Sequence, residues 1–154
     1  MKNIWPAALA FAGTIALSTA FGSESGIEPP AHHHHGAGSP DKRISLELSP
    51  EMKQHQLSNM REHLAAVQAI VRAISENKFE DASKVAHARL GLTPEMQQMC
   101  GMFGNEKFTA LGLAFHRSGD ELGETLKTGN MNASLQAMDK TMSYCVECHA
   151  TFRQ

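Results

Sequence analysis

The last ten residues of the chain, CVECHATFRQ, contain the side chains with the most distinctive chemistry. Cys145 and Cys148 are thiols separated by two residues, and His149 follows the second thiol directly. Cys-x-x-Cys-His is the attachment signature of c-type haem, in which both thiols add to vinyl groups and the histidine binds iron. A disulfide or zinc half-site is disfavoured, because no second Cys or His pair stands at ligand spacing. We therefore expect one covalent haem c, with His149 as the proximal iron ligand.

The elements that position this motif are predicted to be helices, because apolar residues recur three and four positions apart. The predicted helices run from the Ser49 cap to about Glu76, over Phe79–Leu90, from Phe108 to Leu126, and from near Asn132 through the motif. Thr93 and Pro94 predict a further short helical turn, whereas MCGMFGN is expected to form an irregular bend. The predicted fold is all-α, an antiparallel four-helix bundle with covalently attached haem.

Core faces are predicted from the same spacing. They comprise Met60, Leu64, Val67, Val71 and Ile74 on the first helix, and Leu135, Met138, Met142, Cys145 and His149 on the last. Gly112 and Gly119 lie inside the third helix, where a small residue allows haem or a neighbouring helix to approach closely. Cys100 is expected to be a buried thiol.

The N-terminal segment predicts export. Residues 1–20 combine Lys2, a short apolar run and small residues at the end, the layout of a secretory signal peptide. Residues 21–48 are rich in His, Gly and Pro and are expected to be a disordered leader. The remaining residues, 49–154, form the expected domain. We predict a periplasmic protein with no stable membrane insertion after signal cleavage.

Composition narrows the function further. Removal of Lys2 with the signal peptide changes the formal net charge from −2 to −3. The sequence also contains no run of basic residues that could bind a phosphate backbone. Nucleic-acid binding is therefore not expected. Because no nucleophile is accompanied by a supporting catalytic motif, we expect an electron-transfer protein rather than an enzyme, with no catalytic residues.

The export signal, four helices and a motif close to the C-terminal end of the last helix together resemble the class II cytochromes c. This group includes the cytochromes c′ and the low-spin cytochrome c-556 type, which carry Cys-x-x-Cys-His-x-x-x-Arg/Lys in this place. The match consists of Cys145, Cys148, His149 and Arg153. The resemblance implies redox partner proteins, places Arg153 near the proximal histidine, and leads us to expect a homodimer.

The resemblance leaves the opposite face of the iron open. In this family the sixth-site residue comes from the first helix, being apolar in cytochromes c′ and methionine in the c-556 type. Met60 is the first choice for a sixth ligand and His63 the second. With Met60 bound, the haem would be low-spin and would carry single electrons. An open site would instead bind nitric oxide or carbon monoxide at five-coordinate iron.

Two further features remain open. Cytochromes c′ often carry an arginine one turn before the sixth-site residue, where it pairs with a haem propionate, but Gln56 stands there in this chain. The cations that could replace it are Lys53, Arg61 and Arg117. A third function, a haem-carrying copper or metal binder, is suggested by soft donors at two places, namely His32–His35 and the cluster Met96, Met99, Cys100 and Met102.

Overall fold

The computed structural model describes residues 40–154, and the expected signal peptide and His32–His35 lie outside these residues. The elements in chain order are β1 (Ile44–Ser45), α1 (Pro50–Ser75), α2 (Phe79–Leu90), α3 (Pro94–Gly101), α4 (Glu106–Leu126), α5 (Met131–Thr151) and β2 (Phe152–Arg153). The prediction of an all-α chain is confirmed, since the two strands have only two residues each.

Side-chain caps explain where the helices begin. The hydroxyl of Ser49 accepts a hydrogen bond from the backbone N–H of Met52, and the hydroxyl of Thr93 accepts one from Met96. Each cap is followed by a proline at the first helical position, where the missing N–H costs nothing. Asparagine side chains cap α4 and α5 in the same way. The short turn predicted at Thr93 is thus a helix, and it continues through Met99, Cys100 and Gly101, where a bend was expected.

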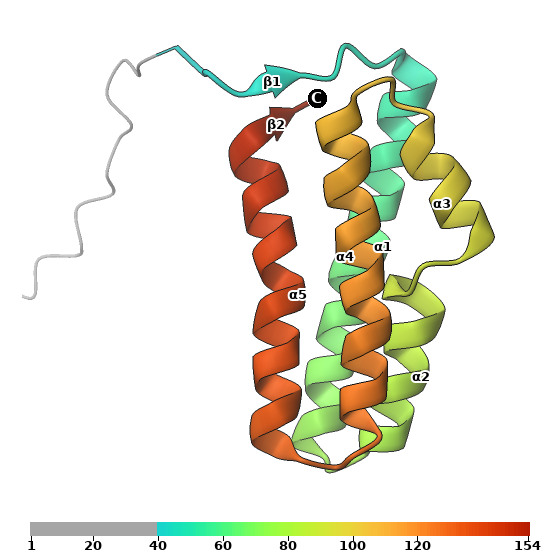
Figure 1. The fold of residues 1–154 in the computed structure, drawn as a ribbon, viewed down its shortest axis with the longest axis vertical. Helices are drawn as coiled ribbons and strands as arrows, with labels where there is room; N and C mark the ends of the chain where they lie inside the picture. Colours follow the sequence, from blue (N-terminus) through green and yellow to red (C-terminus); the bar gives the residue numbers. More distant parts are fainter. Residues whose placement is uncertain (1–39) are drawn as a thin grey trace, which may run out of the picture. The chain divides into compact units, whose positions relative to one another are not determined.

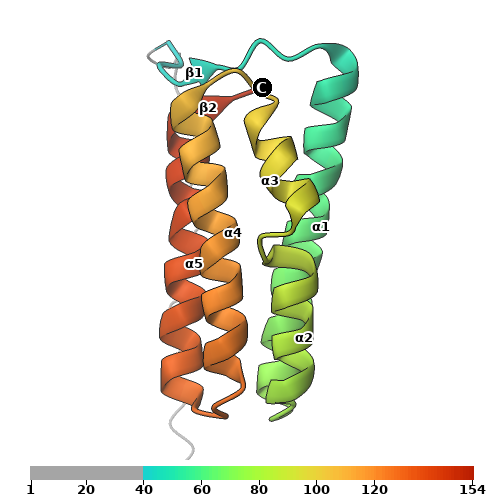
Figure 2. The same ribbon diagram turned by 45° about the vertical axis from the view of Figure 1, so that its right-hand side comes forward.

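The four longer helices lie side by side along one axis (Figures 1 and 2). Successive long helices run in opposite directions, and α3 continues upward from α2 before the chain turns into α4. The principal contacts join α1 with α2, α2 with α4, and α4 with α5, and α3 packs against α4. The upper halves of α1 and α5 both line the cavity described below.

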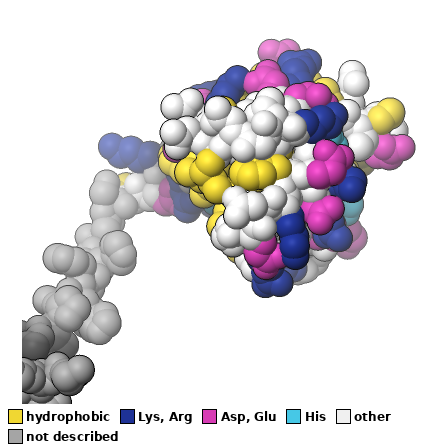
Figure 3. All heavy atoms as spheres, turned by 90° about the horizontal axis from the view of Figure 1, so that it is seen from below, with side chains coloured by type: hydrophobic (Ala, Val, Ile, Leu, Met, Phe, Trp, Pro, Cys, Tyr) yellow, Lys and Arg dark blue, Asp and Glu magenta, His cyan; other side chains and the backbone are white. Residues whose placement is uncertain are grey.

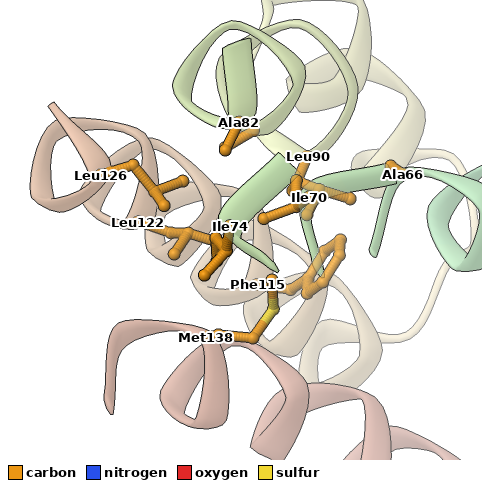
Figure 4. Close-up of a cluster of buried hydrophobic side chains, with 10 residues drawn as sticks. Ala66, Ile70, Ile74, Ala82, Leu90, Phe115, Leu122, Leu126 and Met138 are labelled. Atoms are coloured by element: carbon orange, nitrogen blue, oxygen red, sulfur yellow. The ribbon is translucent and has the colours of Figure 1, made fainter. Parts of the chain in front are cut away.

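The larger of two buried apolar clusters lies away from the C-terminus, where large side chains meet small ones, and the smaller one contains Phe108, Leu111 and Phe152. Ile70, Leu90, Leu122 and Leu126 are fully buried, and Figure 4 shows them with their neighbours. Alanines on α1 and α2 belong to the same cluster. At the crossing of α2 and α4, the carbonyl group of Leu90 faces Gly119, where an added Cβ would lie 2.4 Å from its oxygen. The expected close approach of a helix at Gly119 is therefore confirmed.

The predicted core faces of α1 and α5 are partly wrong. Leu64, Val71 and Leu135 are 71%, 51% and 52% exposed, and Met142 is also exposed. The buried positions of these two helices are Gln56, Ala66, Ile70, Ser134 and Thr141, together with the predicted Ile74 and Met138. Leu64 and Met142 are exposed because they line the cavity described below, whereas the small side chains of Ala66, Ser134 and Thr141 lie where helices pack closely.

A short segment before α1 closes over the end of α5. Ile44 pairs in parallel with Phe152, and Ser45 with Arg153. The guanidinium of Arg43 donates to the carbonyl oxygen of His149 over 3.2 Å and also pairs with Asp41. We call residues 40–48 the strap. Its β pairing corrects the prediction that the leader lacks regular structure as far as residue 48.

The lower end of the molecule is shown in Figure 3, where apolar side chains gather in the middle and charged ones surround them. Met131 at the start of α5 is 38% exposed.

In residues 40–154 no helix combines the length and apolar character needed to cross a membrane.

Candidate functional site

The motif residues and the first helix meet at an apolar cavity of about 440 Å³. Cys145, Cys148 and His149 of α5 line one side, and Met60 and His63 of α1 also contribute. Phe108, Leu111 and Phe115 of α4 and residues of α3 complete the walls. Cavities of this size are typical of sites that hold small organic ligands or cofactors.

A second cavity of about 310 Å³ adjoins the first. The two cavities share the side chains of Gln56, Leu57, Met60, Phe108, Cys148 and His149. The second cavity differs in charge, because Arg43, Lys53 and Arg153 line it. A large apolar space therefore continues into a smaller one with a cationic wall.

Both motif thiols are half-buried and unpaired. Burial raises the pKa of Cys145, and burial together with the neighbouring Cys145 and Glu147 raises the pKa of Cys148 to about 11. Both side chains are therefore neutral thiols at pH 7, compatible with an apolar wall. Helix α5 presents them on successive turns of the same lining.

His149 stands on the last turn of α5, two residues before its end at Thr151. Its imidazole is exposed and lines both cavities. Its backbone carbonyl accepts the hydrogen bond from Arg43, so the strap holds the end of the motif. The ring is therefore anchored through the backbone and is open to a ligand on the cavity side.

The two residues proposed for the opposite side of the iron have different surroundings. Met60 is half-buried and lines both cavities, as His149 does. His63 lines only the larger cavity of the two, where its ring packs 4.9 Å from Phe115 and 5.4 Å from His116, centroid to centroid. Burial and His116 lower the pKa of His63 to about 4. The shared lining favours Met60 over His63 as the partner of His149.

The cationic side chains considered as partners of the haem propionates lie in different places. Lys53 lines the second cavity and Arg61 the first, whereas the exposed Arg117 lines neither. Arg153 does not continue the helix beyond His149, because α5 ends at Thr151 and Arg153 lies in β2, with its Nε atom 3.9 Å from Asp41. Sequence reasoning missed Arg43, whose contact with His149 depends on a pairing between distant segments.

Three of the four clustered soft donors suggested for metal binding line the larger cavity, and Met102 does not. Cys100 is 8% exposed, as predicted, and it lines the larger cavity with Met96 and Met99. Met102 lies beyond the end of α3 and is 61% exposed. Among the described residues, no group of three or more His, Cys, Asp or Glu side chains could hold a metal ion.

The residues present fit a haem. An apolar, aromatic-lined cavity suits the macrocycle, two thiols and a histidine meet it from one helix, and cations in the adjoining space suit propionates. Comparison with protein-family models, curated proteins and solved structures gave no significant match for this chain.

Proposed function

We propose that the protein is an exported monohaem cytochrome c of class II that carries single electrons. The observation that carries this proposal is the convergence of Cys145, Cys148, His149 and Met60 on one apolar cavity. In this proposal α1, α2, α4 and α5 form the antiparallel four-helix bundle, residues 49–154 are the haem domain, and the periplasm is its site of action.

Each residue has a separate role. Cys145 and Cys148 would hold haem c as thioethers, and His149 would bind the iron as the proximal ligand. Met60 would supply the sixth ligand, because it shares both cavities with His149. When bound, the haem supplies one-electron chemistry, and a His/Met ligand pair raises its reduction potential.

The surrounding side chains would tune this site. The apolar wall of Phe108, Leu111 and Phe115 would limit the access of water to a bound haem, which would favour its lower-charged reduced state. Lys53, Arg43 and Arg153 line the second cavity and would neutralise the haem propionates. Gln56 lines the same cavity but carries no charge, so it cannot take this role. Electrons would pass to redox partner proteins at the exposed edge near Leu64 and Met142.

The test is the visible spectrum of the purified haem protein, oxidised and reduced, before and after carbon monoxide. We expect a low-spin spectrum with the far-red sulfur-to-iron band, unchanged by the gas. Met60→Ala should abolish the band and open the site to carbon monoxide, whereas the control His63→Ala should retain the band. A wild-type high-spin spectrum that shifts with the gas would instead identify a five-coordinate binder of nitric oxide or carbon monoxide.

A further inference from the structure

Three polar or sulfur-bearing side chains outside the proposed haem ligands converge between α1 and α3. The Nε2 atom of His55 lies 3.2 Å from the Sδ atom of Met99. The Nδ2 atom of Asn59, one turn after His55, lies 2.9 Å from the same sulfur and 3.4 Å from the same imidazole nitrogen. Helices α1 and α3 are thus joined here through the imidazole of His55 and the sulfur of Met99, and both groups contact the amide of Asn59.

The donor and acceptor properties of these groups limit the roles that each can take. The amide nitrogen of Asn59 carries two N–H donors, and a thioether sulfur can only accept. The Nε2 atom of His55 donates to the sulfur in one tautomer and accepts from the amide of Asn59 in the other. An imidazole nitrogen, a thioether sulfur and an amide nitrogen therefore lie within 3.4 Å of one another.

We infer that His55 and Met99 form a binding site for Cu(I), with Met96 as the third donor. Thioether sulfur and imidazole nitrogen are the soft and borderline ligands that Cu(I) prefers. Met96 stands one turn before Met99 on α3, and both line the larger cavity. Copper would replace the amide of Asn59 as the shared partner of the nitrogen and the sulfur.

The surroundings favour Cu(I) over harder ions. Among the described residues, no carboxylate oxygen forms a hydrogen bond or ion pair with His55 or Met99, and Mg²⁺ and Ca²⁺ require oxygen ligands. Zn²⁺ in structural sites requires four ligands, usually Cys or His. This site does not depend on the proposed haem ligation, because neither His55 nor Met99 has a role in it.

The experiment uses the full-length protein as isolated, with ascorbate present to keep copper as Cu(I). Because His32–His35 could bind copper by themselves, the background chain carries alanine at these four positions. Cu(I) is titrated in competition with a chromophoric chelator, bound copper is counted by elemental analysis, and absorption at the copper edge identifies its ligands. We expect one Cu(I) per chain with both sulfur and nitrogen neighbours.

Three variants decide the assignment. Met99→Leu and His55→Ala should each weaken Cu(I) binding at least tenfold, because each removes a ligand. Met102→Leu is the matched control, since this methionine is exposed beyond the end of α3, and its affinity should equal that of the background chain. Far-UV circular dichroism checks that each variant is folded.

The proposal is overturned if the background chain takes up no stoichiometric Cu(I), or if the copper edge shows no sulfur neighbour. It is also overturned if folded Met99→Leu and His55→Ala bind copper as tightly as Met102→Leu. A failure of the haem proposal would be recognised separately, by the absence of covalent haem in the same preparation.

Discussion

Two histidine rings on the inner wall of the cavity make stability depend on pH. Burial, reinforced by His116, lowers the pKa of His63 from 6.5 to about 4, and burial also lowers the pKa of His116. In the unfolded chain both take up protons near pH 6.5, whereas in the folded protein they remain neutral to lower pH. The unfolded state therefore binds more protons in this interval, and stability falls as the pH falls below 6.5.

We expect the urea midpoint of unfolding to decrease between pH 7 and pH 4, most steeply below 6.5. Replacing His116 by Gln removes one of the two groups but retains a donor for the carbonyl of Leu90, which now accepts from Nδ1 of His116 over 2.9 Å. His116→Gln should therefore show a shallower dependence. An identical pH profile for the variant and the wild type would contradict the role of His116.

Gly119 tests the close crossing of α2 and α4. A Cβ at this position would lie 2.4 Å from the carbonyl oxygen of Leu90, so Gly119→Ala must push the two helices apart. We expect a loss of about 1–3 kcal/mol in the free energy of unfolding, typical of overpacking. The control is Gly101→Ala, where no atom lies within 4 Å of the added Cβ, and its change should stay within about 0.5 kcal/mol. Equal stabilities of the two variants in urea unfolding would refute this explanation.

At the scale of single elements, the cap of α1 offers a direct test. The Ser49 hydroxyl accepts from the N–H of Met52 over 3.3 Å, and its loss leaves a helix-terminal donor without a side-chain partner. Ser49→Ala should reduce the free energy of unfolding by about 1 kcal/mol. Ser58→Ala makes the same chemical change at an exposed position in the middle of α1 and should be neutral or slightly stabilising. Chemical denaturation of both variants measures the difference, and an equal loss in both would exclude capping as the cause.

The helices themselves could be predicted from the sequence to a large extent. The bounds of α2 agree at both ends, Phe79 and Leu90, and the caps at Ser49 and Thr93 are visible as a hydroxyl residue followed by proline. These features depend on neighbours along the chain. The end of α3 was missed because Met99, Cys100 and Gly101 carry no strong local signal for a helix.

The buried faces were harder to predict, because they depend on contacts between helices. Leu64 and Met142 rank as core residues by hydrophobicity, yet both lie exposed on the lining of the cavity. Ser134 and Thr141 are fully buried where α5 packs closely. Cys145, Cys148 and His149 could be recognised as a motif without knowledge of contacts between helices. The approach of Arg43 to His149 could not be predicted in this way, because it depends on the pairing of β1 with β2.

At the scale of the whole molecule, the strap is held to the helices by a small number of contacts. Its attachment to the end of α5 includes the two-residue pairing of β1 with β2, the N–H of Leu46 donating to Arg153 over 3.1 Å, and the exposed contact of Arg43. Few buried contacts and exposed hydrogen bonds mark a segment that opens locally. The fully buried residues of α4, including Leu122, can exchange only through larger opening.

Hydrogen exchange followed by mass spectrometry should therefore show the amides of residues 44–46 exchanging at least tenfold faster than those around Leu122. Arg43→Ala should accelerate exchange in the strap further, because it removes the contact with His149. The exposed Lys42 provides the matched control, and Lys42→Ala should leave the exchange of the strap unchanged. Protection in the strap equal to that around Leu122 would show that the strap and the helices open together.

The strap also implies an order of events in time. Arg43 and the carbonyl of His149 are 106 positions apart in the sequence. Helices form through local contacts, whereas a contact between distant segments must close a long loop and so tends to form late. During that interval the end of α5 would be helical, and Cys148, which lines the second cavity with Arg43 and Leu46, would not yet have the strap beside it. In the proposed cytochrome, haem would be attached at Cys145 and Cys148 before this closure, and the strap would then cover the end of the finished site.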